Sequence, residues 1–176
     1  MRKQHAMLDL ETLGKGSNAV IIAIGAVAFD LDGTALEGFY VNVEPQSCTD
    51  IGMKMDASTV MWWMQQSDEA RATFKKCNTP IQRALMQLSF WLSNKCTDDV
   101  WVWGNGATFD NVIISNAYIL SGVQQHWKYS KDRCYRTLKE LLPHITHERT
   151  GTHHNALDDA RYQAEHCVKL LKGLAP

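Results

Sequence analysis

The sequence predicts an α/β fold, with one mixed sheet flanked by helices, and three observations lead to this prediction. Three strand-like segments come first, at 5–10, 19–30 and 38–43, and turns join them. Helical spacing of apolar residues takes over from about Asp56. A fourth, buried strand follows late, as VWVWG at 100–104. This order is typical of a sheet that starts as three antiparallel strands, gains parallel ones and carries helices on its faces.

Most of the expected helices carry a start or stop signal. Thr79 and Pro80 mark a start, as a cap followed by a first-turn proline. Gly122 marks an end, because glycine accepts the left-handed conformation of a C-cap, and Pro143 marks another. The expected helices start near Asp56 or cover about 79–94, 108–120, 134–142 and 155–172.

The composition fits one globular domain over residues 1–176, since 45% of the residues are apolar and 21% are charged. A net charge of −1 argues against a general nucleic-acid-coating protein, so any polyanion site must be a local patch. The five scattered cysteines form no C-x-x-C pair, which fits reduced thiols in a cytoplasm. The longest uncharged apolar run, 19–29, is too short for a membrane-spanning helix. We therefore expect a soluble, cytoplasmic protein without a membrane partner.

Two acids, Asp9 and Glu11, interrupt the first strand, which otherwise looks buried. Residues two apart on a strand share a face and lie about 6.6 Å apart along the chain, so Leu8 and Leu10 face the other way. Neighbouring carboxylates repel each other unless a cation lies between them or one takes a proton. A divalent metal would remove this conflict. The alternative is an exposed edge strand with two solvated acids.

Further acids follow later in the chain. Asp110 lies just past the fourth strand, on the first turn of a helix, where it could simply compensate the helix dipole. The same position, beyond the carboxyl end of a strand, is where open α/β sheets place their sites. The segment HHNALDDARYQ then supplies His153, His154, Asp158 and Asp159 at the start of the last helix. Each of these residues is ambiguous when it is taken alone.

In chain order, these residues resemble the three motifs of the DEDD exonucleases: DLE at 9–11, GATFD ending at Asp110, and HNALDDA at 154–160. The last motif has the H-x4-D spacing of the histidine (DEDDh) branch, whereas the tyrosine branch would need tyrosine where Asn155 stands. LDLETLG, VIIAIGAVAFD, MWWMQQSDEAR and VWGNGATFDN are also similar to the RNase T-like 3′–5′ exoribonuclease family and its phage relatives. The similarity spans about residues 6–170.

The resemblance implies a ribonuclease H-like fold with five strands, although only four are clear in the sequence. It also implies a metal-dependent 3′–5′ exonuclease that converts single-stranded nucleic acid or 3′ overhangs to nucleoside 5′-monophosphates. Both RNA and DNA enzymes occur among the relatives, and overall similarity favours RNA slightly, with single-stranded DNA as the alternative substrate.

Four carboxylates suit two Mg²⁺ or Mn²⁺ ions, which prefer oxygen ligands. Two such ions about 3.5–4 Å apart can clamp the attacking water and the leaving oxygen of a phosphodiester. By the resemblance, Asp9 would bridge both ions, Glu11 and Asp159 would complete the surroundings of the first, and Asp110 would hold the second.

The same resemblance makes His154 the residue that accepts a proton from the attacking water, as histidine can near neutral pH. His153 is the rival, because it precedes Asp158 by the same spacing. The alignment of HNALDDA with the family favours His154.

The expected substrate contacts are less well defined. Thr12, Leu13 and Gly14 follow the first motif, where the backbone of relatives contacts the terminal nucleotide. Trp62 and Trp63 cannot share one helix face, so one can pack while the other stacks on a base.

Side-chain chemistry suggests three individual contacts, although core or solvent positions are the alternatives for each. Trp63 and Phe109 are the candidates for contact with bases. Arg136 is the candidate for a phosphate, because it lies in the basic stretch 127–149 and because its segment RCYRT is part of the resemblance to the family. The Trp-rich helices could also furnish the surface of a homodimer.

Two rival functions remain. A zinc-binding module could use Cys134, His144, His147, His153 and His154, but their spacing fits no standard zinc motif. A catalytically silent domain that binds nucleic acid or a partner is disfavoured, because all four acids and the histidine are present.

Overall fold

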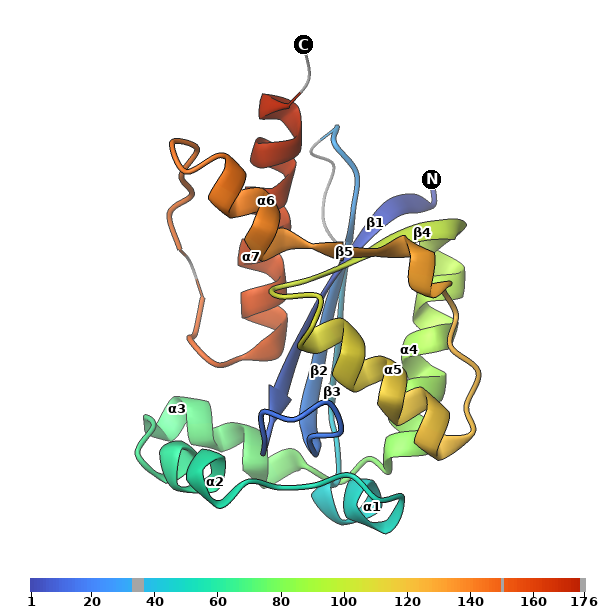
Figure 1. The fold of residues 1–176 in the computed structure, drawn as a ribbon, viewed down its shortest axis with the longest axis vertical. Helices are drawn as coiled ribbons and strands as arrows, with labels where there is room; N and C mark the ends of the chain where they lie inside the picture. The colour runs from blue at the N-terminus through green and yellow to red at the C-terminus, as the bar shows by residue number, and fades with distance from the viewer. Residues whose placement is uncertain (33–36, 150, 175–176) are drawn as a thin grey trace.

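The structure, a computed structural model, describes residues 1–32, 37–149 and 151–174. Its centre is a five-stranded sheet of order β3-β2-β1-β4-β5 (Figure 1). Strand β1 pairs antiparallel with β2, which pairs antiparallel with β3, whereas β4 joins β1 in parallel and β5 joins β4 in parallel. The strands are β1 (Lys3–Thr12), β2 (Ile21–Phe29), β3 (Glu37–Asn42), β4 (Cys96–Gly104) and β5 (Asp132–Cys134). This is the predicted ribonuclease H-like sheet, three antiparallel strands with parallel additions.

The fifth strand was not visible in the sequence. It has only three residues, which is too short to show the alternation that marks a strand. Its pairing with Val102 to Gly104 defines it instead. Strand β4 also starts earlier than predicted, at Cys96, because hydrogen bonding extends it through polar residues that carry no apolar signal.

The predicted helices correspond to α2, α4, α5, α6 and α7. Two short helices, α1 and α3, were not predicted. Helix α4 begins one residue later than expected: Pro80 takes the cap position, and Ser47 Oγ accepts the Ile81 N–H at 2.9 Å. The helices are α1 (Pro45–Asp50), α2 (Ala57–Met64), α3 (Asp68–Arg71), α4 (Ile81–Lys95), α5 (Asp110–Ser121), α6 (Tyr135–Leu141) and α7 (Ala156–Gly173), with 3₁₀ turns at Ala72–Lys76 and Tyr129–Lys131.

Helices cover both faces of the sheet (Figure 1). Helices α6 and α7 pack on the face that carries Met7, Val27 and Trp103, and helices α4 and α5 pack on the face that carries Leu8 and Leu10. Asp9 and Glu11 follow Met7 at spacing two, so they point to the α7 face, and the two leucines point away from it as predicted. Among the described residues, no helix combines the length and apolar character needed to span a membrane.

Glycine lets both helices that border the acids approach the sheet closely. Gly25 lies opposite Asp9 in the β1–β2 register, and a Cβ on it would lie 2.2 Å from the backbone carbon and oxygen of Ala156, the first residue of α7. Gly104 ends β4, and a Cβ there would lie 2.3 Å from Asn111 Oδ1 at the start of α5. Both contacts are shorter than side-chain carbons allow. The starts of α7 and α5 therefore lie directly against the sheet beside Asp9.

Replacing Gly25 with alanine should push the start of α7 away from the sheet. We expect Gly25→Ala to lower the free energy of unfolding by about 1–3 kcal/mol or more, because overpacking of a close contact costs this much. Urea unfolding measures the change. Gly16→Ala is the control, since its added carbon would meet only Asn18 Oδ1 at 3.7 Å. Equal stability of the Gly25 variant and the native protein would contradict the close approach.

Candidate active site

Strand β1 carries two buried acids toward α7. Asp9 is 9% exposed and Glu11 is 7% exposed. Asp9 Oδ1 accepts a hydrogen bond of 2.7 Å from Gln163 Nε2, in the second turn of α7. Glu11 Oε1 is buried and has no hydrogen-bond partner among the described residues. The pairing register of β1 shifts between Glu11 and Thr12, and such irregularities often accompany functional sites.

Asp110 approaches the same strand from the other helix. It is the first residue of α5 and is buried. Its Oδ1 accepts the backbone N–H of Leu10, the residue between the two β1 acids, at 3.2 Å. Asn111 fastens this end of α5, because its Nδ2 donates to the Val102 carbonyl at 3.1 Å and to Asp132 Oδ1 at 2.9 Å. Asp110 is thereby fixed beside Asp9 and Glu11.

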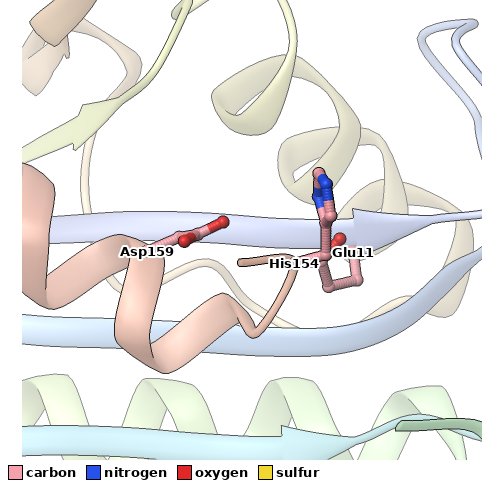
Figure 2. A group of neighbouring side chains, drawn as sticks. All are labelled: Glu11, His154 and Asp159. Carbon is pink, nitrogen blue, oxygen red and sulfur yellow. The ribbon is translucent and has the colours of Figure 1, made fainter. Parts of the chain in front are cut away.

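The start of α7 completes the cluster. Glu11, His154 and Asp159 each offer one ligand atom, and these atoms all lie within 4.8 Å of one another. In Figure 2, Asp159 extends from α7 along β1 toward Glu11 and His154. Asn155 caps the helix by accepting the N–H groups of Leu157 and Asp158. Asp9 and Asp110 lie outside this closest group.

His154, rather than His153, belongs to this group. His154 has φ of 62°, a left-handed conformation that is unfavourable for a residue with a side chain. Its ring meets the Trp62 ring edge-on, with 4.9 Å between centroids. His153 is exposed, and Asp158 accepts the Thr152 N–H at 2.9 Å. The geometry thus favours the predicted register, in which Asp158 has a local structural role.

Burial and mutual repulsion dominate the electrostatics. Burial and then the Asp110 charge raise the pKa of Glu11 to about 8. Burial raises the pKa of Asp110 to about 7, although backbone hydrogen bonds from Leu10 and Asn105 oppose the rise. Burial, with the charges of Asp110 and Glu11, also raises the pKa of Asp9 well above its ordinary value. The Arg149 charge lowers the pKa of Asp9 and Glu11, but it does not offset the effect of burial.

These residues fit a divalent cation. The donors are carboxylate oxygens and one imidazole. This oxygen-rich set suits Mg²⁺ or Mn²⁺, whereas zinc commonly binds at thiolate-rich sites. The buried, unpartnered Glu11 Oε1 and the raised pKa values indicate a missing positive charge. In the described part of the chain, Glu11, His154 and Asp159 are the one group of three potential ligands, so Cys134, His144 and His147 do not gather as a zinc module would require.

A hollow of about 360 Å³ opens beside Glu11. Four of the predicted substrate contacts line it: Thr12, Gly14, Trp63 and Phe109. Leu13 instead lines a separate apolar hollow with Met55 and Phe74. Arg136 is exposed, and its Nη2 donates to the Asn105 carbonyl at 2.7 Å, near the start of α5.

The two adjacent tryptophans differ in burial and in contacts. Trp63 is 3% exposed, and its Nε1–H donates to the Thr12 carbonyl at 2.9 Å, which fixes the backbone after Glu11. Trp62 is 41% exposed and lines the same hollow. Trp62 is therefore the tryptophan with an exposed ring surface. The sequence alone could not distinguish it from Trp63, because two adjacent tryptophans have the same side-chain chemistry.

Two further residues of the site were not predicted. Gln163 follows Asp159 by four residues, so helical spacing could have placed both on one face. Arg149 forms an ion pair with Asp159 through Nη2. It lay within the basic stretch noted in the sequence, but its partner lies ten residues further along the chain, in α7.

The raised pKa of Glu11 predicts how stability depends on pH. In metal-free protein, the stability that protonated Glu11 contributes is present below its ordinary pKa of 4.5 and is lost as the pH rises through about 8. Glu11→Gln removes this loss. We expect the stability of the variant relative to the native protein to rise by about 3–4 kcal/mol between about pH 5 and about pH 8. Urea unfolding in a chelator measures it, and a constant difference across this range would contradict the assignment.

Comparison with known proteins identifies the family of the chain. No curated protein matches the chain. Residues 4–171 match the family described as the 3′–5′ exoribonuclease Rv2179c-like domain, so the match includes all four acids and His154. Because the match covers nearly the whole sequence, the chain belongs to this family of 3′–5′ exoribonuclease domains.

Proposed function

We propose that the chain is a metal-dependent 3′–5′ exonuclease of the DEDDh type. It removes nucleoside 5′-monophosphates from single-stranded nucleic acid or 3′ overhangs and prefers RNA to DNA. The observation that carries the proposal is the meeting of Glu11, His154 and Asp159 from β1 and the start of α7. Asp9 and Asp110 are anchored beside them by Gln163 and Leu10. The family match supports the reaction class.

Asp9, Glu11, Asp110 and Asp159 would hold two Mg²⁺ or Mn²⁺ ions. Such ions, when bound, stabilise charge on the phosphate and promote attack by water. The chain itself contributes a rigid frame, because Asp9 and Asp110 are each fixed by a hydrogen bond. The unpartnered Glu11 Oε1 stays available for a ligand.

His154 is suited to accept a proton from the attacking water. Burial, then the charges of His153 and Arg149, lower its pKa, so the ring is neutral at physiological pH. The edge-on contact with Trp62 restrains the ring beside Glu11 and Asp159. General bases of this kind contribute about 10²–10⁴-fold to rates.

The hollow beside Glu11 suits the terminal nucleotide. It is large enough for one nucleotide, and the rings of Trp62 and Phe109 line it. Thr12 Oγ1 donates to the Gly14 carbonyl at 2.8 Å, which holds the backbone wall in place. Stacking on aromatic rings tolerates every base, as an exonuclease that degrades varied sequences requires.

Removal of one ligand or of the base should separate catalysis from binding. With 3′-labelled RNA and DNA of matched sequence and added Mg²⁺ or Mn²⁺, we expect labelled mononucleotides from the start of the reaction, and faster release from RNA. Asp9→Asn should abolish release yet still bind RNA in a filter assay, because Asp9 would be one of the residues that hold the ions. His154→Ala should slow release by about 10²–10⁴-fold.

Asp158→Asn is the matched control, since this neighbour of Asp159 lies outside the ligand group and should stay active. Mononucleotides released first from a 5′ label would refute the polarity. An Asp9→Asn variant with native activity would refute the site.

Trp62 should contribute to substrate affinity through stacking. We expect Trp62→Ala to raise KM about tenfold, because stacking on one aromatic ring contributes about 1–3 kcal/mol, and Trp62→Phe should restore most of the affinity. Steady-state kinetics on short RNA measures the effect. Phe90→Ala is the control, since Phe90 is 72% exposed on α4 and lines no part of the hollow. An unchanged KM in Trp62→Ala would contradict the role.

A further inference from the structure

One cation lies inside the acidic cluster. Arg149 Nη2 pairs with Asp159 Oδ1, and only 27% of the Arg149 side chain is exposed. The guanidinium carbon also lies 5.2 Å from the centre of the Tyr162 ring on α7, within the range of a cation–π contact. Its positive charge lowers the pKa of both Asp9 and Glu11, against the upward effect of burial. Arg149 thus acts electrostatically on at least three of the four acids.

The pairing is incomplete on the side of the arginine. Arg149 Nε is buried and has no hydrogen-bond partner among the described residues. A guanidinium usually binds a carboxylate through two nitrogens when it serves as a permanent structural pair. Here the ion pair joins one guanidinium nitrogen to one carboxylate oxygen, and the second contact is the face of an aromatic ring. This arrangement neutralises charge without locking Arg149 in place.

The position of Arg149 conflicts with metal binding. Asp159 belongs to the ligand group with Glu11 and His154, and its Oδ1 is occupied by the guanidinium. Two cations that share a cluster of buried carboxylates also repel each other. A divalent ion that takes Asp159 as a ligand must therefore displace the guanidinium or weaken its pairing.

We propose that Arg149 is an internal competitor for the metal site: it pairs with Asp159 in the metal-free protein and leaves this carboxylate when a divalent cation binds. The inference rests on the proposed metal site. Its consequence is a built-in limit on metal affinity, because each binding event must first break the ion pair. In return, the metal-free protein keeps part of its buried negative charge compensated.

Manganese binding to the metal-free protein tests the proposal without any measurement of activity. The EPR signal of free Mn²⁺ reports the dissociation constant. We expect Arg149→Gln to bind Mn²⁺ about five- to tenfold more tightly than the native protein, which corresponds to removal of one partly buried ion pair. Arg149→Lys keeps the charge and should bind with nearly native affinity.

Thermal melting gives a second, independent readout. Arg149→Gln should melt at a lower temperature than the native protein without metal, and its melting temperature should rise more on saturation with Mn²⁺. Arg161→Gln is the matched control, because Arg161 lies near Asp158, with 3.9 Å between Nη1 and Oδ1, and Asp158 lies outside the ligand group. It should leave Mn²⁺ affinity unchanged.

The outcomes distinguish failure of the proposed metal site from failure of the proposed role of Arg149. If the native protein binds no Mn²⁺, the metal site of the proposed function fails. If the native protein binds Mn²⁺ and Arg149→Gln binds it equally or more weakly, Arg149 orders the site instead of competing for it, and the inference is overturned. Tighter binding by Arg149→Gln, with native affinity in Arg149→Lys, supports it.

Discussion

Buried negative charge at the end of β1 is the constraint on which the rest of the site depends. Removing a carboxylate from water is unfavourable unless hydrogen bonds or positive charge replace the lost hydration. Asp9 accepts a hydrogen bond from Gln163, and Asp110 accepts backbone hydrogen bonds from Leu10 and Asn105. Glu11 Oε1 receives none from the described residues. A cluster built in this way is stable only when protons or cations complete it, and that requirement is the physical reason for the proposed metal site.

Close approach by the two helices creates this constraint. Gly25 and Gly104 leave no side chain between the sheet and the first turns of α7 and α5. With a side chain at Gly25, the start of α7 would lie further from β1, and Asp159 would no longer meet Glu11. The same fold could therefore exist without the site. The glycines, as much as the acids, decide that four carboxylates gather at one end of the sheet.

The sequence predicted the main architecture because its signals are local. Alternation in β1 placed Asp9 and Glu11 on one face and Leu8 and Leu10 on the other, and the strand order of the three antiparallel strands followed from short turns. The short strand β5 escaped prediction because three residues carry no periodicity and only the pairing with β4 defines them.

Part of the candidate site was also predictable from the sequence. The acids and His154 were predicted from three motifs that follow one another in chain order, and their spacing reflects the strand and helices that carry them. Arg149 and the exposed ring of Trp62 could not be assigned, because their roles depend on contacts across the fold. No residue-level signal distinguishes an arginine that pairs with Asp159 from one that faces solvent. Likewise, the choice between Trp62 and Trp63 depends on which ring the backbone of Thr12 binds.

The positive charge of Arg149 also affects His154. A proton acceptor must be neutral before the reaction, and burial together with the charges of His153 and Arg149 lowers the pKa of His154. A divalent cation among Glu11, Asp9 and Asp159 would act in the same direction, since any nearby positive charge disfavours imidazolium. Exchange of Arg149 for a metal therefore changes which cation compensates the acids, while the histidine stays neutral. The acids need a cation and the histidine needs to stay unprotonated, and one positive charge placed between them satisfies both requirements.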